Sequence, residues 1–345
     1  MHRTPLLAAA AVVVLAVAGL ASATPRLIIS GTTVQVLEEK TDAAPLKITI
    51  YVPSGYTASI VQTPGSQIGT VHADLQALAI SPDAIIQAEG TVLAGDPSNA
   101  QLQASATQCT GTPTHAAIWL LHVTVSGTTL DVPEYLDPTS ATEGALGVAK
   151  IVLCLSDPYD NAGPARAAFG AKIVNAKMTL NPNVIRAPTS GSYLWRSIIT
   201  PWNPSTPAPD AAHTVEAQSL VALPQKVTLK AVVTKKGKGK KKRATVTLSG
   251  SVTEGQSTLS FPGVANATVD IYANGKKVAT VKTGSSGAYS KTLALKKKTA
   301  FQAKATVPQR DTSCQSPLPT TSVPGGCASA TLAGWTATAT ASAKP

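Results

Sequence analysis

Thr283-Gly-Ser-Ser-Gly-Ala-Tyr289 is a glycine- and serine-rich segment inside residues 244–307, and the pattern of these residues predicts the fold of the C-terminal part of the chain. On both sides of it, apolar residues alternate with polar ones. These apolar residues are Val246, Leu248, Val269, Ile271, Val278, Tyr289, Leu293, Leu295, Phe301, Ala303, Ala305 and Val307. Alternation with a period of two is typical of short strands that bury one face. Asn274-Gly275 tolerates the positive φ values of a two-residue hairpin. The stretch therefore predicts a small antiparallel β-sandwich.

Three motifs of this stretch resemble those of carboxypeptidase-regulatory-like and bacterial Ig-like sandwiches. They are Leu248-Ser-Gly-Ser-Val252, Ala267-Thr-Val-Asp-Ile-Tyr272 and the segment in which Gly287 and Tyr289 match the recurrent glycine and aromatic residue of those families. The resemblance covers residues 226–307 and no part of the N-terminal half. It implies an Ig-like or transthyretin-like fold of the kind found on secreted proteins, and it implies no catalytic residue.

The first 23 residues have the three parts of a secretory signal peptide. His2 and Arg3 precede an apolar run, 6–20, which is followed by Ala21-Ser-Ala23. This arrangement predicts export and cleavage after Ala23. A transmembrane helix needs about 18–20 apolar residues, so no membrane-spanning segment is expected after cleavage. The mature protein is expected to be extracellular, either secreted or associated with the cell surface.

The rest of the chain also has the pattern of strands. The N-terminal runs are 27–37, 46–52, 56–62, 68–80, 85–93, 101–108, 116–125, 148–155, 171–180, 193–200 and 214–223, and only 163–170 has helical character. We therefore predict an all-β protein with two β-sandwich-type domains, residues 24–223 and residues 224–345. Four prolines within 201–209 leave a second boundary open, at 201–211.

Cysteine content and charge agree with an exported chain of two parts. Four cysteines in an exported protein predict two disulfides, and of the three possible pairings domain order favours Cys109–Cys154 with Cys314–Cys327.

Residues 218–345 hold 19 Lys and Arg against 3 Asp and Glu, a net charge of +16, whereas residues 1–217 hold 10 against 15, a net charge of −5. This asymmetry indicates an anionic partner for the second half.

The basic run 235–243 is the strongest charged feature. It consists of Lys235, Lys236, Lys238, Lys240, Lys241, Lys242 and Arg243 with two glycines. One interpretation is a contact with an anionic cell-envelope polymer or with lipid headgroups, and the other is a solvated hairpin loop that keeps a strand edge soluble. No nucleic-acid partner is expected for an exported protein.

Aromatic residues offer a second candidate surface. Tyr193 and Trp195 are two apart and share a strand face, and Trp202 follows in proline-rich sequence. An exposed patch could stack on a glycan or a protein partner. The competing interpretation, which we favour, places Tyr193 and Trp195 in the core.

No catalytic, metal or cofactor site is predicted. The chain has no G-x-S-x-G, H-E-x-x-H or glycine-rich phosphate motif. His115 and His122 are seven apart on one run, and so face opposite sides of a strand. The acidic segment 157–161 fits Asx-turns better than a calcium site. We therefore expect a non-catalytic binding or structural protein, and the alternative is a secreted hydrolase with its catalytic residues in the N-terminal domain.

Overall fold

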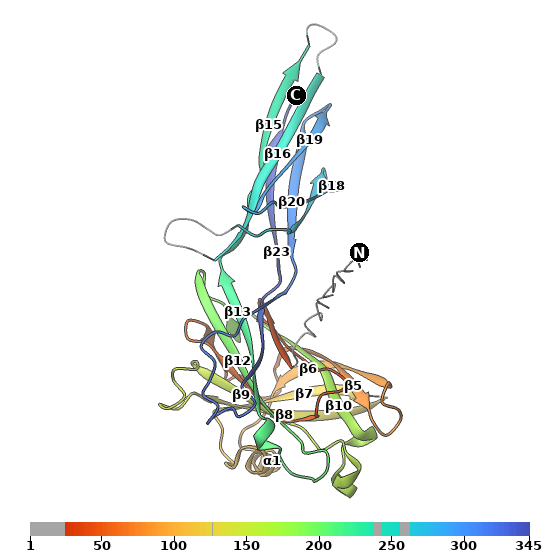
Figure 1. The fold of residues 1–345 in the computed structure, drawn as a ribbon, viewed down its shortest axis with the longest axis vertical. Coiled ribbons are helices and arrows are strands. Elements are labelled where there is room, and N and C mark those ends of the chain that lie inside the picture. The colour runs from red at the N-terminus through yellow and green to blue at the C-terminus, as the bar shows by residue number, and fades with distance from the viewer. Residues whose placement is uncertain (1–24, 126, 238–242, 256–262) are drawn as a thin grey trace, which may run out of the picture.

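The computed structural model describes residues 25–345 except 126, 238–242 and 256–262. Most of these residues lie in strands, and the part of the chain so described contains one α-helix. Figure 1 shows a broad body of crossing strands and a long, narrow body attached to it. The predicted all-β class is therefore confirmed at the level of secondary structure.

The broad body is built on one sheet of thirteen strands. In spatial order these are β1 (Arg26–Ser30), β2 (Thr33–Leu37), β10 (Ala171–Leu180), β5 (Gln67–Ala77), β6 (Ile85–Ala94), β7 (Ala117–Val125), β8 (Thr128–Pro138), β9 (Ala149–Cys154), β3 (Pro45–Val52), β12 (Gly191–Pro201), β13 (Val215–Leu223), β22 (Cys327–Leu332) and β21 (Arg310–Thr312). All neighbours are antiparallel except β13 and β22, which are parallel. A separate two-stranded sheet pairs β4 (Thr57–Ala58) with β11 (Ile185–Arg186).

This sheet is rolled, so that its first strand meets the opposite end. The backbone N–H of Ile29 on β1 donates to Ser219 Oγ on β13 at 3.2 Å, and Thr331 Oγ1 on β22 donates to the carbonyl oxygen of Leu27 at 2.7 Å. The inner face encloses one large apolar core that includes Trp119 and Trp195. A rolled sheet can bury alternate residues of every strand without a second layer.

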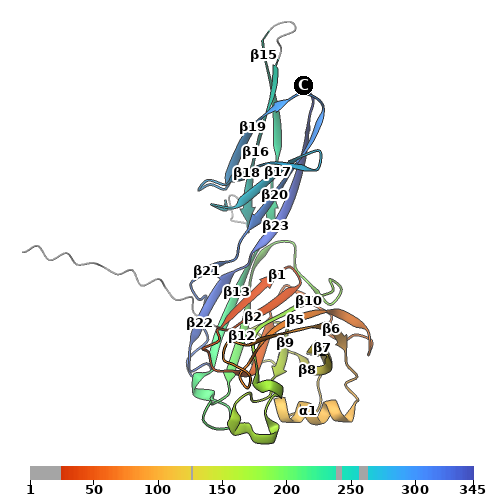
Figure 2. The same cartoon turned by 90° about the vertical axis from the view of Figure 1, so that its right-hand side faces the viewer.

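The helix α1 (Ala100–Thr110) covers part of the outer face, at the base of the molecule in Figure 2. Its Ala106 packs with Ile118, Tyr135 and Val152. The strand predicted at 101–108 is therefore wrong. Asn99 Oδ1 accepts the first free N–H groups of the helix, and Gly111 ends the helix in the left-handed conformation. These two capping residues were the sequence signals for a helix.

The narrow body consists of two four-stranded sheets. The first contains β14 (Gln225–Val227), β15 (Lys230–Lys236), β16 (Arg243–Glu254) and β19 (Ala288–Leu295), and the second contains β17 (Thr268–Ala273), β18 (Lys276–Lys282), β20 (Thr299–Val307) and β23 (Trp335–Ala343). Leu248 and Leu295 of the first sheet share an apolar core with Ile271 and Phe301 of the second. The hairpin predicted at Asn274-Gly275 is present, and both residues have positive φ.

The chain crosses between the two bodies three times, at 223–225, at 307–310 and at 332–335. Residues 310–332, which the predicted boundary at 224 groups with the second domain, supply β21 and β22 of the 13-stranded sheet. The alternative boundary region, 201–211, lies inside the broad body between β12 and β13. At the junction, Glu254 accepts hydrogen bonds from Arg310 Nη2 at 2.5 Å and from Trp335 Nε1 at 2.8 Å.

The two disulfides have the predicted pairing. Cys109 at the end of α1 is bonded to Cys154 on β9, and Cys314 is bonded to Cys327 at the start of β22. Both lie in the broad body, since the second closes a loop at the edge of its sheet.

Candidate functional site

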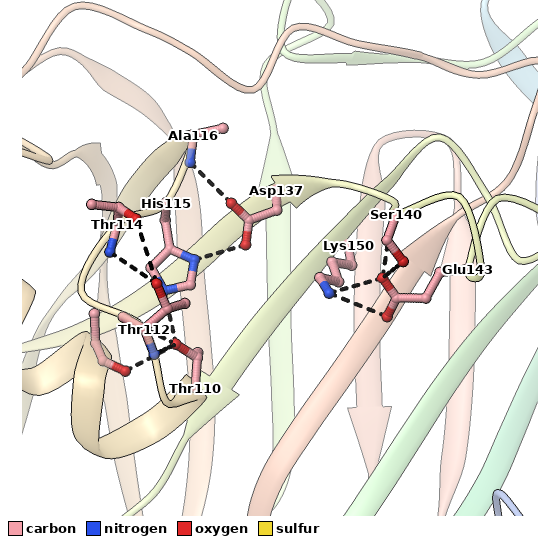
Figure 3. A network of polar contacts seen from close by, with 10 residues as sticks. Thr110, Thr112, Thr114, His115, Ala116, Asp137, Ser140, Glu143 and Lys150 are labelled. Atoms are coloured by element: carbon pink, nitrogen blue, oxygen red, sulfur yellow. Dashed lines mark hydrogen bonds and ion pairs between the residues drawn. The ribbon is translucent and has the colours of Figure 1, made fainter.

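The connection between α1 and β7 contains a hydroxyl, an imidazole and a carboxylate in line (Figure 3). Thr110 Oγ1 lies 2.9 Å from His115 Nε2, and His115 Nδ1 lies 2.7 Å from Asp137 Oδ2. This order of groups is the one that activates a hydroxyl nucleophile in hydrolases. It is the arrangement nearest to catalytic machinery in the described part of the chain.

The surroundings of these three groups favour a structural role. The His115 side chain is only 1% exposed and its ring packs on Tyr135 at a centroid distance of 5.0 Å. Thr110 Oγ1 also contacts the carbonyl oxygen of Ala106 at 3.0 Å, and the backbone N–H of Ala116 donates to Asp137 Oδ1 at 3.0 Å. Neither of the two cavities described below is lined by these residues. The network therefore fixes the 110–116 connection against β8.

A second polar cluster in Figure 3 is centred on Glu143. Its carboxylate accepts hydrogen bonds from Lys150 Nζ at 2.9 and 3.1 Å, from Ser140 Oγ at 2.9 Å and from Tyr51 Oη at 2.9 Å. Burial alone would raise the pKa of Glu143, but the Lys150, Ser140 and Tyr51 hydrogen bonds outweigh it and lower the pKa to about 2. These three partners hold the carboxylate in its ionised form, so the cluster closes the connection between β8 and β9.

The other three histidines of the described residues also pair with carboxylates, but at separate places. His72 contacts Glu89 at 2.6 Å and Asp74 at 3.3 Å. His122 pairs with Asp131 and His213 pairs with Asp210, each at 2.7 Å. Within the described ranges, no group of three or more His, Cys, Asp or Glu side chains could hold a metal ion.

The acidic segment 157–161 contains separate contacts. Asp157 Oδ1 accepts the backbone N–H of Tyr159 at 2.9 Å, as in an Asx-turn, and Asp160 pairs with Arg166. Asn161 Nδ2 donates to the carbonyl oxygen of Pro204 at 3.3 Å. These contacts fix the loop that precedes β10.

The three aromatic residues do not form one surface: Trp195 is buried, whereas Tyr193 and Trp202 are partly buried at separate contacts. Trp195 is 1% exposed and meets Tyr56 edge to face at 5.0 Å. Tyr193 is partly buried against the same Tyr56 ring, at 5.5 Å. Trp202 Nε1 donates to the carbonyl oxygen of Leu155 at 3.1 Å. Because Trp195 faces the core, it cannot contribute a stacking surface together with the other two rings.

The described residues of the basic run lie at the end of the narrow body that is farther from the 13-stranded sheet, which we call the distal end (Figure 1). Lys235 and Lys236 on β15 are exposed, and Lys236 pairs in register with the exposed Arg243 on β16. Lys238, Lys240, Lys241 and Lys242 lie outside the described residues.

Strand register brings further basic residues to the distal end. Ala244 next to Arg243 pairs with Leu295, so Lys296–Lys298 follow directly beside the basic run. Thr299 pairs with Ala343, which places Lys344 at the same end. The backbone N–H of Asn274 donates to Ala300, and Lys276 follows that turn. Separate loops therefore gather exposed Lys and Arg at one end, which the sequence analysis did not predict.

The acidic residues of residues 218–345 are already paired. Glu254 pairs with Arg310 at 2.5 Å, Asp270 with Lys277 at 2.6 Å, and Asp311 with Arg26 at 3.0 Å. Because this part of the chain has only three acidic residues, its distal lysines have no further Asp or Glu side chain there to neutralise them.

Glu134 on β8 is a buried carboxyl group that the sequence analysis missed. It is 5% exposed, its Oε2 has no hydrogen-bond partner among the described residues, and burial raises its pKa to about 8. The sequence pattern that could have indicated its burial is the alternation of Val132, Glu134 and Leu136. Residues two apart on a strand share one face, and here that face is the inner one.

No protein-family model matches the chain, and no curated protein sequence is significantly similar to it. No helix among the described residues is long and apolar enough to cross a membrane.

Proposed function

We propose that the chain is an exported, non-catalytic binding protein whose basic distal end attaches to an anionic cell-envelope polymer or to anionic lipid headgroups. The observation that carries this proposal is the convergence of Lys235, Lys236, Arg243, Lys296–Lys298 and Lys344 at one end of a narrow body. The pairing of every acidic residue in that part of the chain supports it. Export is supported by the N-terminal sequence pattern and by the two disulfides.

The narrow body is, in this proposal, an Ig-like or transthyretin-like sandwich that acts as a spacer. Its support is the shared core between two four-stranded sheets and the agreement of Gly287 and Tyr289 with the family landmarks. Such a spacer holds the distal end away from the rolled sheet, so that the basic loops can reach a surface.

The size of the effect follows from simple electrostatics. A Lys or Arg close to an anionic membrane contributes about 1 kcal/mol, and the interaction decays within about 8 Å at physiological salt. Replacing three of the distal charges should therefore weaken binding at least 10-fold, and raising the salt concentration should weaken it steeply.

The test is co-sedimentation of the purified protein with vesicles of phosphatidylcholine alone or with phosphatidylglycerol added, together with retention on immobilised polyphosphate. The test variant carries Gln at Lys296, Lys297 and Lys298. The matched control carries Gln at Lys47, Lys177 and Arg186, three basic residues of the broad body. Binding that is the same for both variants and insensitive to salt would contradict the proposal. Binding to polyphosphate alone would identify a polymer as the partner, and binding to vesicles alone would identify lipid.

The second candidate, a secreted hydrolase, rests on the Thr110, His115 and Asp137 arrangement. A hydrolase of this kind would lose activity on p-nitrophenyl esters when Thr110 is replaced by Val. Activity that survives T110V would remove this candidate, and its loss with retention of the fold would favour it.

A further inference from the structure

The inner face of the 13-stranded sheet surrounds a cavity of about 650 Å³. Inward-facing apolar side chains of neighbouring strands form most of its wall, among them Val71, Ala88, Leu121, Val123, Val132 and Leu153. A space of this size and lining is typical of sites that bind small molecules. This cavity is independent of the distal end, because it belongs to the other body.

The mouth of the cavity carries exposed apolar side chains. Phe169, on the loop before β10, is 48% exposed although it lines the cavity, and Leu130 on β8 is 42% exposed. Phe169 also has a φ of 59°, which is costly for a bulky residue. Strained backbone of this kind is found preferentially at ligand sites.

The two basic residues that line the cavity, Lys172 and Arg166, are already engaged. Lys172 Nζ donates to the carbonyl oxygens of Glu39 at 3.0 Å and Lys40 at 3.1 Å, and also to that of Asp42. Arg166 Nε donates to the carbonyl oxygen of Pro158 at 2.8 Å, and its Nη1 pairs with Asp160. The cavity is therefore not arranged to hold the carboxylate of an anionic ligand.

The deep end of the interior carries one buried carboxyl group. A second, small cavity of about 40 Å³ is lined by Glu134 and shares Val71, Leu121, Leu153 and Ala176 with the large one. Glu134 lies two residues beyond Val132 on the same face of β8 and pairs in register with Trp119 and Leu153. Lys177 is the other ionisable residue of the small cavity, and it is exposed.

A buried carboxyl group without a partner is costly, and a ligand group that hydrogen-bonds to it removes that cost. In an apolar interior the uncharged acid is favoured, and it offers one O–H donor and a carbonyl acceptor. A hydroxyl or carbonyl group on a ligand can hydrogen-bond to this donor and acceptor. A ligand ammonium group would instead pair with an ionised Glu134, and both charged groups would then lose their hydration on burial.

We propose that the interior of the 13-stranded sheet binds a small, uncharged apolar molecule with one hydroxyl or carbonyl group, and that this group meets the Glu134 carboxyl at the deep end. Phe169 and Leu130 contact the apolar part of the ligand at the mouth. Glu134 confers the preference for a neutral polar group, and the apolar wall supplies the affinity.

The test is isothermal titration calorimetry of the full-length mature protein with 1-decanol, decylamine and decanoate at pH 6.5. We expect saturable binding of 1-decanol, at least 10-fold tighter than that of either charged probe. The Glu134→Leu variant should lose this preference, and Glu134→Gln, which keeps a donor and an acceptor, should retain it.

Val123→Phe tests the location of the site, since Val123 lines the cavity, and Thr124→Phe is its control on the exposed face of the same strand. Binding should be lost in V123F and kept in T124F; if V123F fails to fold by circular dichroism, Ala88→Leu replaces it. No saturable binding of any probe, equal binding by V123F and T124F, or tightest binding of decanoate would overturn the proposal. An unchanged preference in E134L would overturn the role of Glu134.

Discussion

The guanidinium of Arg196 on β12 forms an ion pair with the carboxylate of Glu216 on β13, and Glu216 has no solvent exposure. Glu216 Oε2 also accepts the backbone N–H of Leu318 at 3.0 Å, and Arg196 Nη2 donates to the carbonyl oxygen of Ser316 at 2.9 Å. Two charged residues of the N-terminal half thus hold the loop closed by the Cys314–Cys327 disulfide. This pair therefore anchors the loop at the edge of the 13-stranded sheet, beside the pairing of β22 with β13.

Removal of one partner from this pair should be strongly destabilising. Glu216→Ala leaves Arg196 as a buried charge without its carboxylate, a change that costs about 3–5 kcal/mol. Asp83→Ala is the control, because its ion pair with Lys40 at 3.3 Å is exposed and contributes about 0–1 kcal/mol. Urea unfolding at pH 7 measures both free energies. Equal decreases in the free energy of unfolding of the two variants would show that the buried ion pair contributes no more to stability than the exposed one.

Glu134 should make the protein less stable as the pH rises. Its pKa is about 8 in the folded chain, against 4.5 for an ordinary glutamate, so between these values the folded state binds the extra proton. The free energy of unfolding should therefore fall by about 1.4 kcal/mol per pH unit from this group. Glu134→Gln removes the effect, and its stability relative to the parent should increase by roughly 3–4 kcal/mol between pH 5 and pH 8.

Urea unfolding at pH 5, 6, 7 and 8 measures the difference in free energy of unfolding between Glu134→Gln and the parent protein. Burial also raises the pKa of Glu38 to about 8, but Glu38 is present in both proteins and cancels from the comparison. If the difference in free energy of unfolding between the two proteins stays constant from pH 5 to pH 8, Glu134 keeps an ordinary pKa in the folded chain.

The two disulfides should contribute unequally to stability. The Cys109–Cys154 bridge closes a sequence separation of 45 and the Cys314–Cys327 bridge one of 13. On the chain-entropy model these loops correspond to about 4 and about 3 kcal/mol. Paired Cys→Ala variants, compared by urea unfolding under non-reducing conditions, measure the two losses. A larger loss for the shorter loop would indicate that contacts in the folded state outweigh chain entropy.

Gly287 should not tolerate a side chain, whereas Gly275 should tolerate one at moderate cost. Both have positive φ, 75° and 80°, which costs alanine about 1 kcal/mol. A Cβ at Gly287 would lie 2.4 Å from the carbonyl oxygen of Val252, while a Cβ at Gly275 would meet nothing within 4 Å. Gly287→Ala should therefore lower the melting temperature clearly more than Gly275→Ala. Similar shifts would mean that the turn at Gly287 moves freely away from β16.

Local patterns in the sequence determined much of the narrow body. Alternation around Leu248, Ile271 and Phe301 predicts which face each strand buries, and Asn274-Gly275 predicts the hairpin between two of them. The disulfide pairing and the split of charge between the two halves were also readable from the chain, because each depends on composition and order along the sequence.

Tertiary structure alone decided the long-range arrangement. Alternation indicates that a strand has a buried face, but it does not indicate which strand lies beside it. Pairings such as β2 with β10 and β13 with β22 join segments far apart in the chain. One rolled sheet therefore replaces the predicted N-terminal sandwich-type arrangement, and β22 returns to pair with β13. The gathering of Lys296–Lys298 and Lys344 beside the basic run, and the position of Glu134 at the deep end of a cavity, arise only when those strands are in register.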